Sequence, residues 1–149
     1  MRVGDSKTPI VAQFFLSLIM KRNKLEIIIS APIGKVFEFT TNALNTPKWI
    51  KEIVKEETNE FPIKIGTIYK NLNNEGIWTE YEVVSLEENK LFQLKQRNSS
   101  YCVRYDYQSI SADITKLIYT EWVEEGNIKN PFKQEVLEEL KKIIEQNRS

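Results

Sequence analysis

Hydrophobic and polar positions follow two different periods along this chain, and the two periods predict two kinds of element. Between residues 24 and 125 most of the chain reads as strand, and apolar side chains recur at every second position most clearly at 77–86 and 101–108. From residue 130 to residue 147 apolar side chains recur at helical spacing, opposite a charged face. The apolar positions of this closing stretch are Phe132, Val136, Leu137, Leu140, Ile143 and Ile144.

The closing stretch predicts one long helix over residues 130–147. Asn130 can cap its start, and Pro131 suits a first helical position because proline has a fixed φ and no N–H donor. No Gly or Pro interrupts the residues that follow. A single apolar stripe must be buried against another element, and the only available partner is the preceding sheet.

The stretch before this helix predicts a first strand, two short helices and then six consecutive strands. Residues 25–30 are short and β-branched, and Pro32 can open a helix that stops near Asn42. Thr46 and Pro47 start a second short helix, in which Trp49 is expected to anchor the core between the two helices. Six strands are predicted at 54–60 (poorly apolar, hence an edge), 67–72, 77–86, 91–97, 101–108 and 114–124.

The sixth of the predicted sheet's seven strands has the clearest alternation. One face carries Tyr101, Val103, Tyr105 and Tyr107, and the other carries Cys102, Arg104, Asp106 and Gln108. The seventh strand is ambiguous, because Leu117 and Tyr119 compete with Ile118 and Trp122 for the inside. Consecutive strands joined by short turns predict an antiparallel meander, and therefore an α+β architecture.

The domain boundary is expected at residue 24, with residues 24–149 forming one folded domain. Residues 1–23 differ from the rest, because an apolar run at 9–20 is followed directly by basic residues. Twelve residues are too few to span a bilayer as a helix. We expect 1–23 to be an extension outside the core fold, with a short docking helix or a targeting segment as alternatives.

Charge and residue usage exclude several classes of function. Lys plus Arg and Asp plus Glu both number 21, so no basic excess favours nucleic acid or stable association with an anionic membrane. The chain has no histidine, and Cys102 is its only cysteine, so neither an intrachain disulfide nor a cysteine-based metal cluster is expected. We therefore expect no metal, no cofactor and a reducing, cytoplasmic compartment.

Four further segments carry recognisable motifs: 27–32 (IIISAP) followed by Val36-Phe37, 45–49 (NTPKW), 66–69 (GTIY) and 82–91 (EVVSLEENKL). These motifs resemble those of the helix-grip superfamily, which includes START lipid-transfer domains, birch-pollen allergens and polyketide cyclase/dehydrase-like proteins. Together with the closing helix they cover about residues 25–146, and the subgroup they resemble most is the polyketide cyclase/dehydrase type. Residues 61–65 lack the Gly-rich loop of the pollen-allergen branch, and residues 119–122 match the last-strand motif only loosely.

This resemblance implies a helix-grip fold, in which a strongly curved antiparallel sheet wraps around a long C-terminal helix. Two short helices follow the first strand, and an apolar cavity often lies between the sheet and the last helix. The resemblance thus implies binding of a small hydrophobic or amphipathic molecule such as a lipid, by a monomer or a homodimer.

A tyrosine-rich inner face is the candidate binding surface within such a cavity. Tyrosine combines apolar bulk with a polar tip, which suits a mostly apolar ligand that carries a few oxygens. The alternative is that these rings fill the space and bond to one another. The candidate ligand-binding residues are Tyr69, Tyr81, Val83, Val103, Tyr105, Tyr107, Tyr119, Glu121, Phe132, Val136 and Leu140.

Two other functions remain open on the sequence. A cyclase-like enzyme would need a positioned acid or base, for which Glu121, Asp106 and Arg104 are candidates, although no catalytic constellation is recognisable and Cys102 has no histidine to activate it. An interaction or regulatory domain with a filled core could use the glutamate pairs at 56–57, 87–88, 124–125 and 138–139, which we expect to be solvated.

Overall fold

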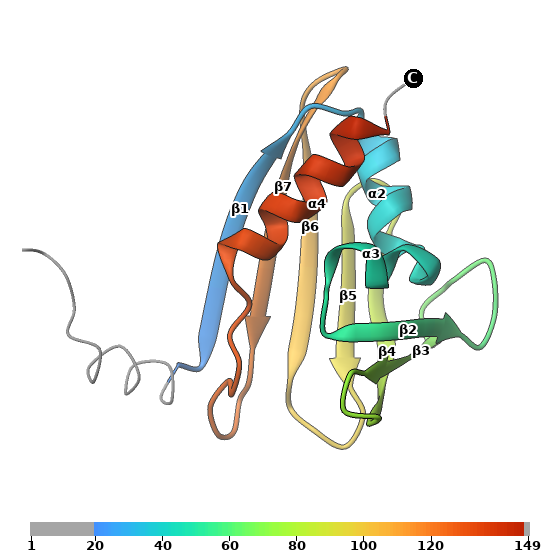
Figure 1. Cartoon of the computed structure of the whole chain (residues 1–149), viewed down its shortest axis with the longest axis vertical. Coiled ribbons are helices and arrows are strands. Elements are labelled where there is room, and N and C mark those ends of the chain that lie inside the picture. The colour runs from blue at the N-terminus through green and yellow to red at the C-terminus, as the bar shows by residue number, and fades with distance from the viewer. Residues whose placement is uncertain (1–19, 148–149) are drawn as a thin grey trace, which may run out of the picture.

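One antiparallel sheet curves around a long helix in the computed structural model of this chain, which describes residues 20–147 (Figure 1). The strand order is β1-β7-β6-β5-β4-β3-β2, so the predicted meander runs from β2 to β7 and β1 joins it beside β7. The predicted edge position of β2 is confirmed. The strands are β1 (Arg22–Ile29), β2 (Ile53–Thr58), β3 (Ile68–Asn73), β4 (Trp78–Glu87), β5 (Leu91–Gln96), β6 (Cys102–Ser111) and β7 (Ile114–Trp122).

The helices lie together on one side of the curved sheet (Figure 1). After β1 come α2 (Ile33–Thr41), the 3₁₀ turn η1 (Ala43–Asn45) and the short α3 (Thr46–Trp49); α4 (Gln134–Gln146) closes the chain. Pro32 forms the N-cap of α2, close to its predicted start. Leu137, Leu140 and Ile144 form the buried stripe of α4, as its periodicity predicts.

The predicted start of the closing helix is wrong by three to four residues. α4 begins at Gln134 after Lys133, and neither Asn130 nor Pro131 caps it. The backbone around Phe132 is used in contacts with the sheet instead: its N–H donates to Glu121 and its carbonyl accepts from Asn23. These contacts hold the segment before α4 against the sheet, and the helix begins two residues after Phe132.

Strand register settles which side of β7 faces inward. Tyr119 lies between Leu25 of β1 and Tyr105 of β6, and Leu117 lies between Ile27 and Tyr107. The inner row of β7 is therefore Thr115, Leu117, Tyr119 and Glu121, all of them buried. The predicted inner face of β6 is confirmed, since Val103, Tyr105 and Tyr107 are buried as well.

Trp49 anchors the core beneath the short helices, as the sequence predicts. Its ring is buried and meets Tyr105 and Phe132 edge-on, with ring centroids 6.5 and 6.0 Å apart. Among residues 20–147 it carries the one buried side-chain nitrogen or oxygen without a hydrogen-bond partner, the indole Nε1.

The first strand begins earlier than the sequence suggests. Arg22 and Asn23 pair with Trp122 and Glu121 of β7, so both residues belong to the sheet rather than to an extension. Most of the apolar run at 9–20, with its docking and targeting alternatives, lies outside the described residues. None of the helices that the structure describes is long and apolar enough to cross a membrane.

Candidate functional site

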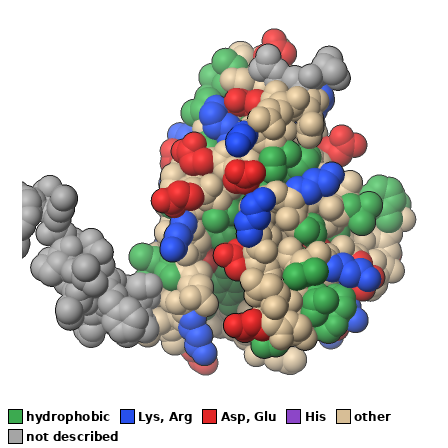
Figure 2. Space-filling view, viewed as in Figure 1, with side chains coloured by type: hydrophobic (Ala, Val, Ile, Leu, Met, Phe, Trp, Pro, Cys, Tyr) green, Lys and Arg blue, Asp and Glu red, His purple; other side chains and the backbone are tan. Residues whose placement is uncertain are grey.

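A cavity of about 130 Å³ lies between the concave face of the sheet, the short helices and the segment that leads into α4. The space-filling view shows this side of the molecule hollowed, with hydrophobic side chains inside the hollow (Figure 2). Aromatic and aliphatic side chains form most of its wall. The lining residues are Thr40, Thr46, Ile50, Ile53, Glu56, Tyr69, Asn71, Tyr81, Phe92, Leu94, Tyr101, Val103, Tyr105, Tyr119 and Phe132.

A larger depression of about 550 Å³ follows the outer side of α4 but has a different character. It is lined by charged and amide side chains, among them Glu135, Lys142 and Gln146. Such side chains on the exposed face of an amphipathic helix are ordinarily solvated. The cavity under the short helices is therefore the better candidate for a small-molecule site.

The structure brings together part of the predicted site. Six of the predicted residues line the cavity: Tyr69, Tyr81, Val103, Tyr105, Tyr119 and Phe132. Four others, Val83, Tyr107, Glu121 and Leu140, are buried without lining it, and Val136 is half-buried on α4. The role of the six lining residues in ligand binding stays a prediction.

Aromatic rings in contact with one another form the floor and one side of the cavity. Tyr119 and Phe132 stack with ring centroids 4.2 Å apart, and Tyr105 meets Tyr119 edge-on at 5.4 Å. Phe92 lies 5.5 Å from both Tyr69 and Tyr105. Cross-strand pairing produces this cluster, because Tyr105 is registered between Phe92 and Tyr119.

Several tyrosine hydroxyls are bonded to the protein itself. Tyr69 donates to the carbonyl of Thr41 over 2.6 Å, and the hydroxyls of Tyr107 and Thr40 lie 2.6 Å apart. Burial raises the pKa of Tyr81 to about 12 and raises the pKa of Tyr69 further. These phenols are therefore neutral hydrogen-bonding groups at physiological pH rather than bases.

Glu121 points inward from β7, as the sequence suggested it could, but it serves the framework of the site. Its side chain is fully buried and accepts hydrogen bonds from Asn23 (2.8 Å), from the N–H of Phe132 (2.6 Å) and from the hydroxyl of Tyr101 (2.5 Å). Three donors satisfy a buried carboxylate. Glu121 thus fixes Phe132 and Tyr101, two residues of the cavity wall.

Glu56 is the ionisable residue of the wall that sequence reasoning missed. Its side chain on β2 accepts a 2.5 Å hydrogen bond from Thr46 and a 3.4 Å hydrogen bond from Asn71, its cross-strand neighbour. The residue is only 8% exposed, and burial raises the pKa of its carboxyl to about 7. The expectation that the pair at 56–57 is solvated holds for Glu57 and is wrong for Glu56.

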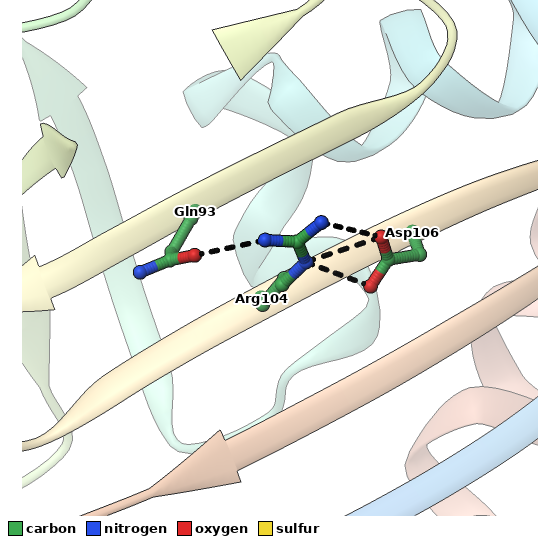
Figure 3. A network of polar contacts seen from close by, with 3 residues as sticks. All are labelled: Gln93, Arg104 and Asp106. Atoms are coloured by element: carbon green, nitrogen blue, oxygen red, sulfur yellow. Dashed lines mark hydrogen bonds and ion pairs between the residues drawn. The ribbon is translucent and has the colours of Figure 1, made fainter. Parts of the chain in front are cut away.

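Arg104 and Asp106 lie away from this cavity. They point from β6 to the side of the sheet opposite the helices, where the Arg104 guanidinium donates to both carboxylate oxygens of Asp106 and to Gln93 (Figure 3). Cys102 shares that side of the strand, and burial raises the pKa of its thiol. The arrangement removes all three residues from chemistry inside the cavity.

Metal binding is not indicated by the described part of the chain. No group of three or more His, Cys, Asp or Glu side chains is placed to hold an ion within residues 20–147. The cavity wall combines one buried carboxyl, neutral tyrosines and apolar rings, and it includes no Lys or Arg.

Solved structures share this architecture at low sequence identity. A START superfamily protein from Mycobacterium smegmatis superposes with a TM-score of 0.69 at 14% identity, covering 86% of this chain and 99% of that one. The Aha1 dimer from Colwellia psychrerythraea gives 0.63 at 15%, covering 87% and 100%. A Polyketide_cyc-like protein from Corynebacterium glutamicum gives 0.52 at 21%, covering 68% and 64%.

The chain has the helix-grip fold. The superpositions and the curved seven-stranded sheet with its closing helix confirm the fold that the sequence resemblance implies. No protein-family model and no curated protein matches the sequence. At these identities the likeness extends to the fold, and function has to be argued from the cavity itself.

Proposed function

We propose that this protein binds a small amphipathic molecule in the cavity between the curved sheet and the segment leading into α4. The observation that carries the proposal is the cavity wall: contacting aromatic rings with one buried carboxyl, Glu56, among them. Mostly apolar pockets with a few placed polar groups are typical of small-molecule sites. The START and Polyketide_cyc-like names of two structural neighbours are consistent with such a role.

The volume of the cavity narrows the size of the ligand. An apolar cavity of roughly 150 Å³ holds one benzene molecule, whereas drug-sized ligands occupy about 300 Å³ or more. The 130 Å³ found here therefore favours a ligand of about six non-hydrogen atoms. A lipid, which the resemblance to START lipid-transfer domains implies, would extend beyond this space.

An interaction or regulatory domain is the second candidate, because one loop exposes apolar side chains. Phe61 is 87% exposed and Ile65 is 62% exposed, both between β2 and β3. The Aha1 neighbour is a dimer, which is consistent with a homodimer here. A cyclase-like enzyme ranks third and would use Glu56, whose raised pKa suits a general acid or base.

Binding can be tested with a neutral probe and a variant that fills the cavity. Cyclopentanol has about the size of benzene. Its titration into 15N-labelled protein should shift the NMR signals of amide groups around the cavity. Val103→Phe adds a ring at the cavity wall and should abolish these shifts. Val84→Phe, the same change on a partly exposed residue outside the wall, is the control.

Circular dichroism of both variants establishes that they fold. Absence of cyclopentanol binding to the wild-type protein, or shifts that persist unchanged in a folded Val103→Phe variant, would overturn the proposal. Loss of cyclopentanol binding in Val103→Phe, together with unchanged binding in Val84→Phe, is the result expected if the probe binds in the cavity.

A further inference from the structure

We infer that the cavity selects a small organic cation, whose ammonium group pairs with Glu56 and whose apolar body lies against the aromatic rings. This inference rests on the proposed function and specifies the chemical class of the ligand. It is carried by the charge of the wall, by the hydrogen-bonding capacity left on the Glu56 carboxylate and by the kind of side chains that surround it.

The charge of the wall is one-sided. Glu56 is the only Asp, Glu, Lys or Arg among the lining residues, and no ion pair of Glu56 is found among the described residues. Its two hydrogen-bond donors, Thr46 and Asn71, are both neutral. Burying a carboxylate without a cation costs free energy. A ligand that brings a positive charge to Glu56 removes this cost, and its binding is favoured accordingly.

The Glu56 carboxylate also has room for another donor. Its two oxygens together offer about four acceptor positions, and the described contacts use two of them. Thr46 holds Oε1 firmly at 2.5 Å, whereas the contact of Oε2 with Asn71 is long, at 3.4 Å. Oε2 is therefore the atom to which a ligand N–H would donate.

The aromatic rings of the wall favour the same ligand charge. Ring faces attract cations through their quadrupole and repel anions, and small ammonium groups are recognised in this way in other proteins. Tyr69, Tyr105 and Phe132 supply such rings within the cavity. An anionic ligand would meet both a carboxyl and the negative ring faces, and a neutral ligand would leave Glu56 without a counter-charge.

The groups that face Glu56 do not titrate near neutral pH. They are Thr46 from α3, Asn71 and Tyr69 from β3, Tyr81 from β4 and Tyr105 from β6. Burial raises the pKa of each of the three tyrosines, so they stay neutral. The flanking side chains at positions 55 and 57 are exposed. The protonation of Glu56 thus sets the charge of the cavity.

A matched pair of probes tests the inference. Cyclopentylamine and cyclopentanol have the same ring and number of non-hydrogen atoms, and the amine is protonated at pH 8, as lysine is. Calorimetric titration of wild-type protein at pH 8 should give at least about tenfold tighter binding of the amine. Glu56→Gln should remove this preference, so that the variant binds the two probes with equal affinity, and the exposed Glu57→Gln variant should keep it.

The possible outcomes separate this inference from the function on which it rests. Equal binding of the two probes overturns cation selection and leaves the small-molecule site standing. Binding of neither probe overturns both. A preference for the amine that survives in Glu56→Gln also overturns the inference, since the charge that attracts it then lies elsewhere. If Glu56→Gln does not fold, wild-type protein at pH 6 replaces it, because protonation of Glu56 should weaken amine binding alone.

Discussion

The backbone N–H of Phe132 donates a 2.6 Å hydrogen bond to the carboxylate of Glu121, joining β7 to the segment that leads into α4. Asn23 reaches the same carboxylate and also the carbonyl of Phe132, so the first strand takes part in the junction. The ring of Phe132 is thereby held against Tyr119 in the cavity wall. A buried polar junction therefore shapes an apolar cavity.

Removal of the Glu121 carboxylate should destabilise the protein in a graded way. Glu121→Ala leaves three half-buried donors without their acceptor and should lower the free energy of unfolding by about 2 to 4 kcal/mol. Glu121→Gln retains an acceptor oxygen and should cost less, about 1 to 2 kcal/mol. Urea denaturation measures both. Glu125→Gln, at an exposed position, is the control and should behave as wild type. A Glu121→Ala variant as stable as wild type would show that the hydrogen bonds of Glu121 do not contribute to stability.

Stability should fall between pH 5 and pH 8 because of Glu56. Its pKa is raised from 4.5 to about 7 in the folded protein, so between these values the folded state holds a proton that the unfolded state has lost. The stabilising contribution is complete below pH 4.5 and is lost as the pH rises through about 7. The loss amounts to about 3 kcal/mol.

The comparison with Glu56→Gln isolates this effect, because glutamine does not titrate. The difference in free energy of unfolding, variant minus wild type, should grow in favour of the variant from pH 5 to pH 8. Urea denaturation of both proteins at intervals of one pH unit gives this difference. The groups that both proteins share titrate alike, so their contributions cancel in it. A difference that stays constant with pH would show that Glu56 does not bind its proton more tightly in the folded protein.

The pH should also control the binding of cyclopentylamine. The amine remains protonated up to about pH 10, as lysine does, so its affinity follows the ionisation of Glu56. With a pKa of about 7, the ionised fraction of Glu56 rises with pH, and binding should strengthen roughly tenfold between pH 6 and pH 8. Calorimetry at these two values checks the rise. Cyclopentanol affinity should stay constant, and an equal rise for both probes would argue against a role for the charge.

Tyr107→Phe should affect stability without affecting the cavity. The buried hydroxyl of Tyr107 bonds to Thr40, which also donates to the carbonyl of Val36, so its removal should cost about 1 kcal/mol. The remaining ring keeps its edge-on contact with Phe37 at 5.1 Å. Affinity for cyclopentanol should be unchanged, because Tyr107 does not line the cavity. Loss of probe binding in this variant would show that Tyr107 contributes to the binding site, as the sequence predicts.

Asp106→Asn should be nearly neutral. The pair of Arg104 and Asp106 is about one-third exposed on the outer side of the sheet, where ion pairs contribute less than about 1 kcal/mol. Thermal unfolding should change little, and cyclopentanol binding should be retained. A variant that folds but no longer binds the probe would connect the outer side of the sheet to the cavity.

The sequence predicts the architecture because two simple periods determine it. Alternation places Val103, Tyr105 and Tyr107 on one side of β6, and the heptad-like stripe of Leu137, Leu140 and Ile144 needs the surface that those strands provide. The order from β2 to β7 then follows from connections between consecutive strands, whereas the place of β1 beside β7 does not. The facing of β7 required pairing on both sides, since its own pattern fits either orientation.

Of the two buried carboxyls, Glu121 lies in phase with Leu117 and Tyr119, so its inward direction could be anticipated, whereas the burial of Glu56 could not. A register shift between Ile53 and Lys55 changes the phase of β2, so Val54 is exposed and Glu56 is buried, against the order expected from hydropathy. Asn23 lies outside the strand that the sequence predicts, so its hydrogen bond to Glu121 could not be predicted either.

The junction at Glu121 also imposes an order on protein synthesis. Asn23 is among the first described residues to leave the ribosome, yet its partners Glu121 and Phe132 follow 98 and 109 residues later. Until then β1 has no strand to pair with, and its apolar residues, Ile27 and Ile29, have no core to enter. The nascent chain therefore carries an unpaired apolar strand until β7 has been made, which exposes a segment that chaperones can bind, and the cavity is completed only when its last wall residue, Phe132, has been made.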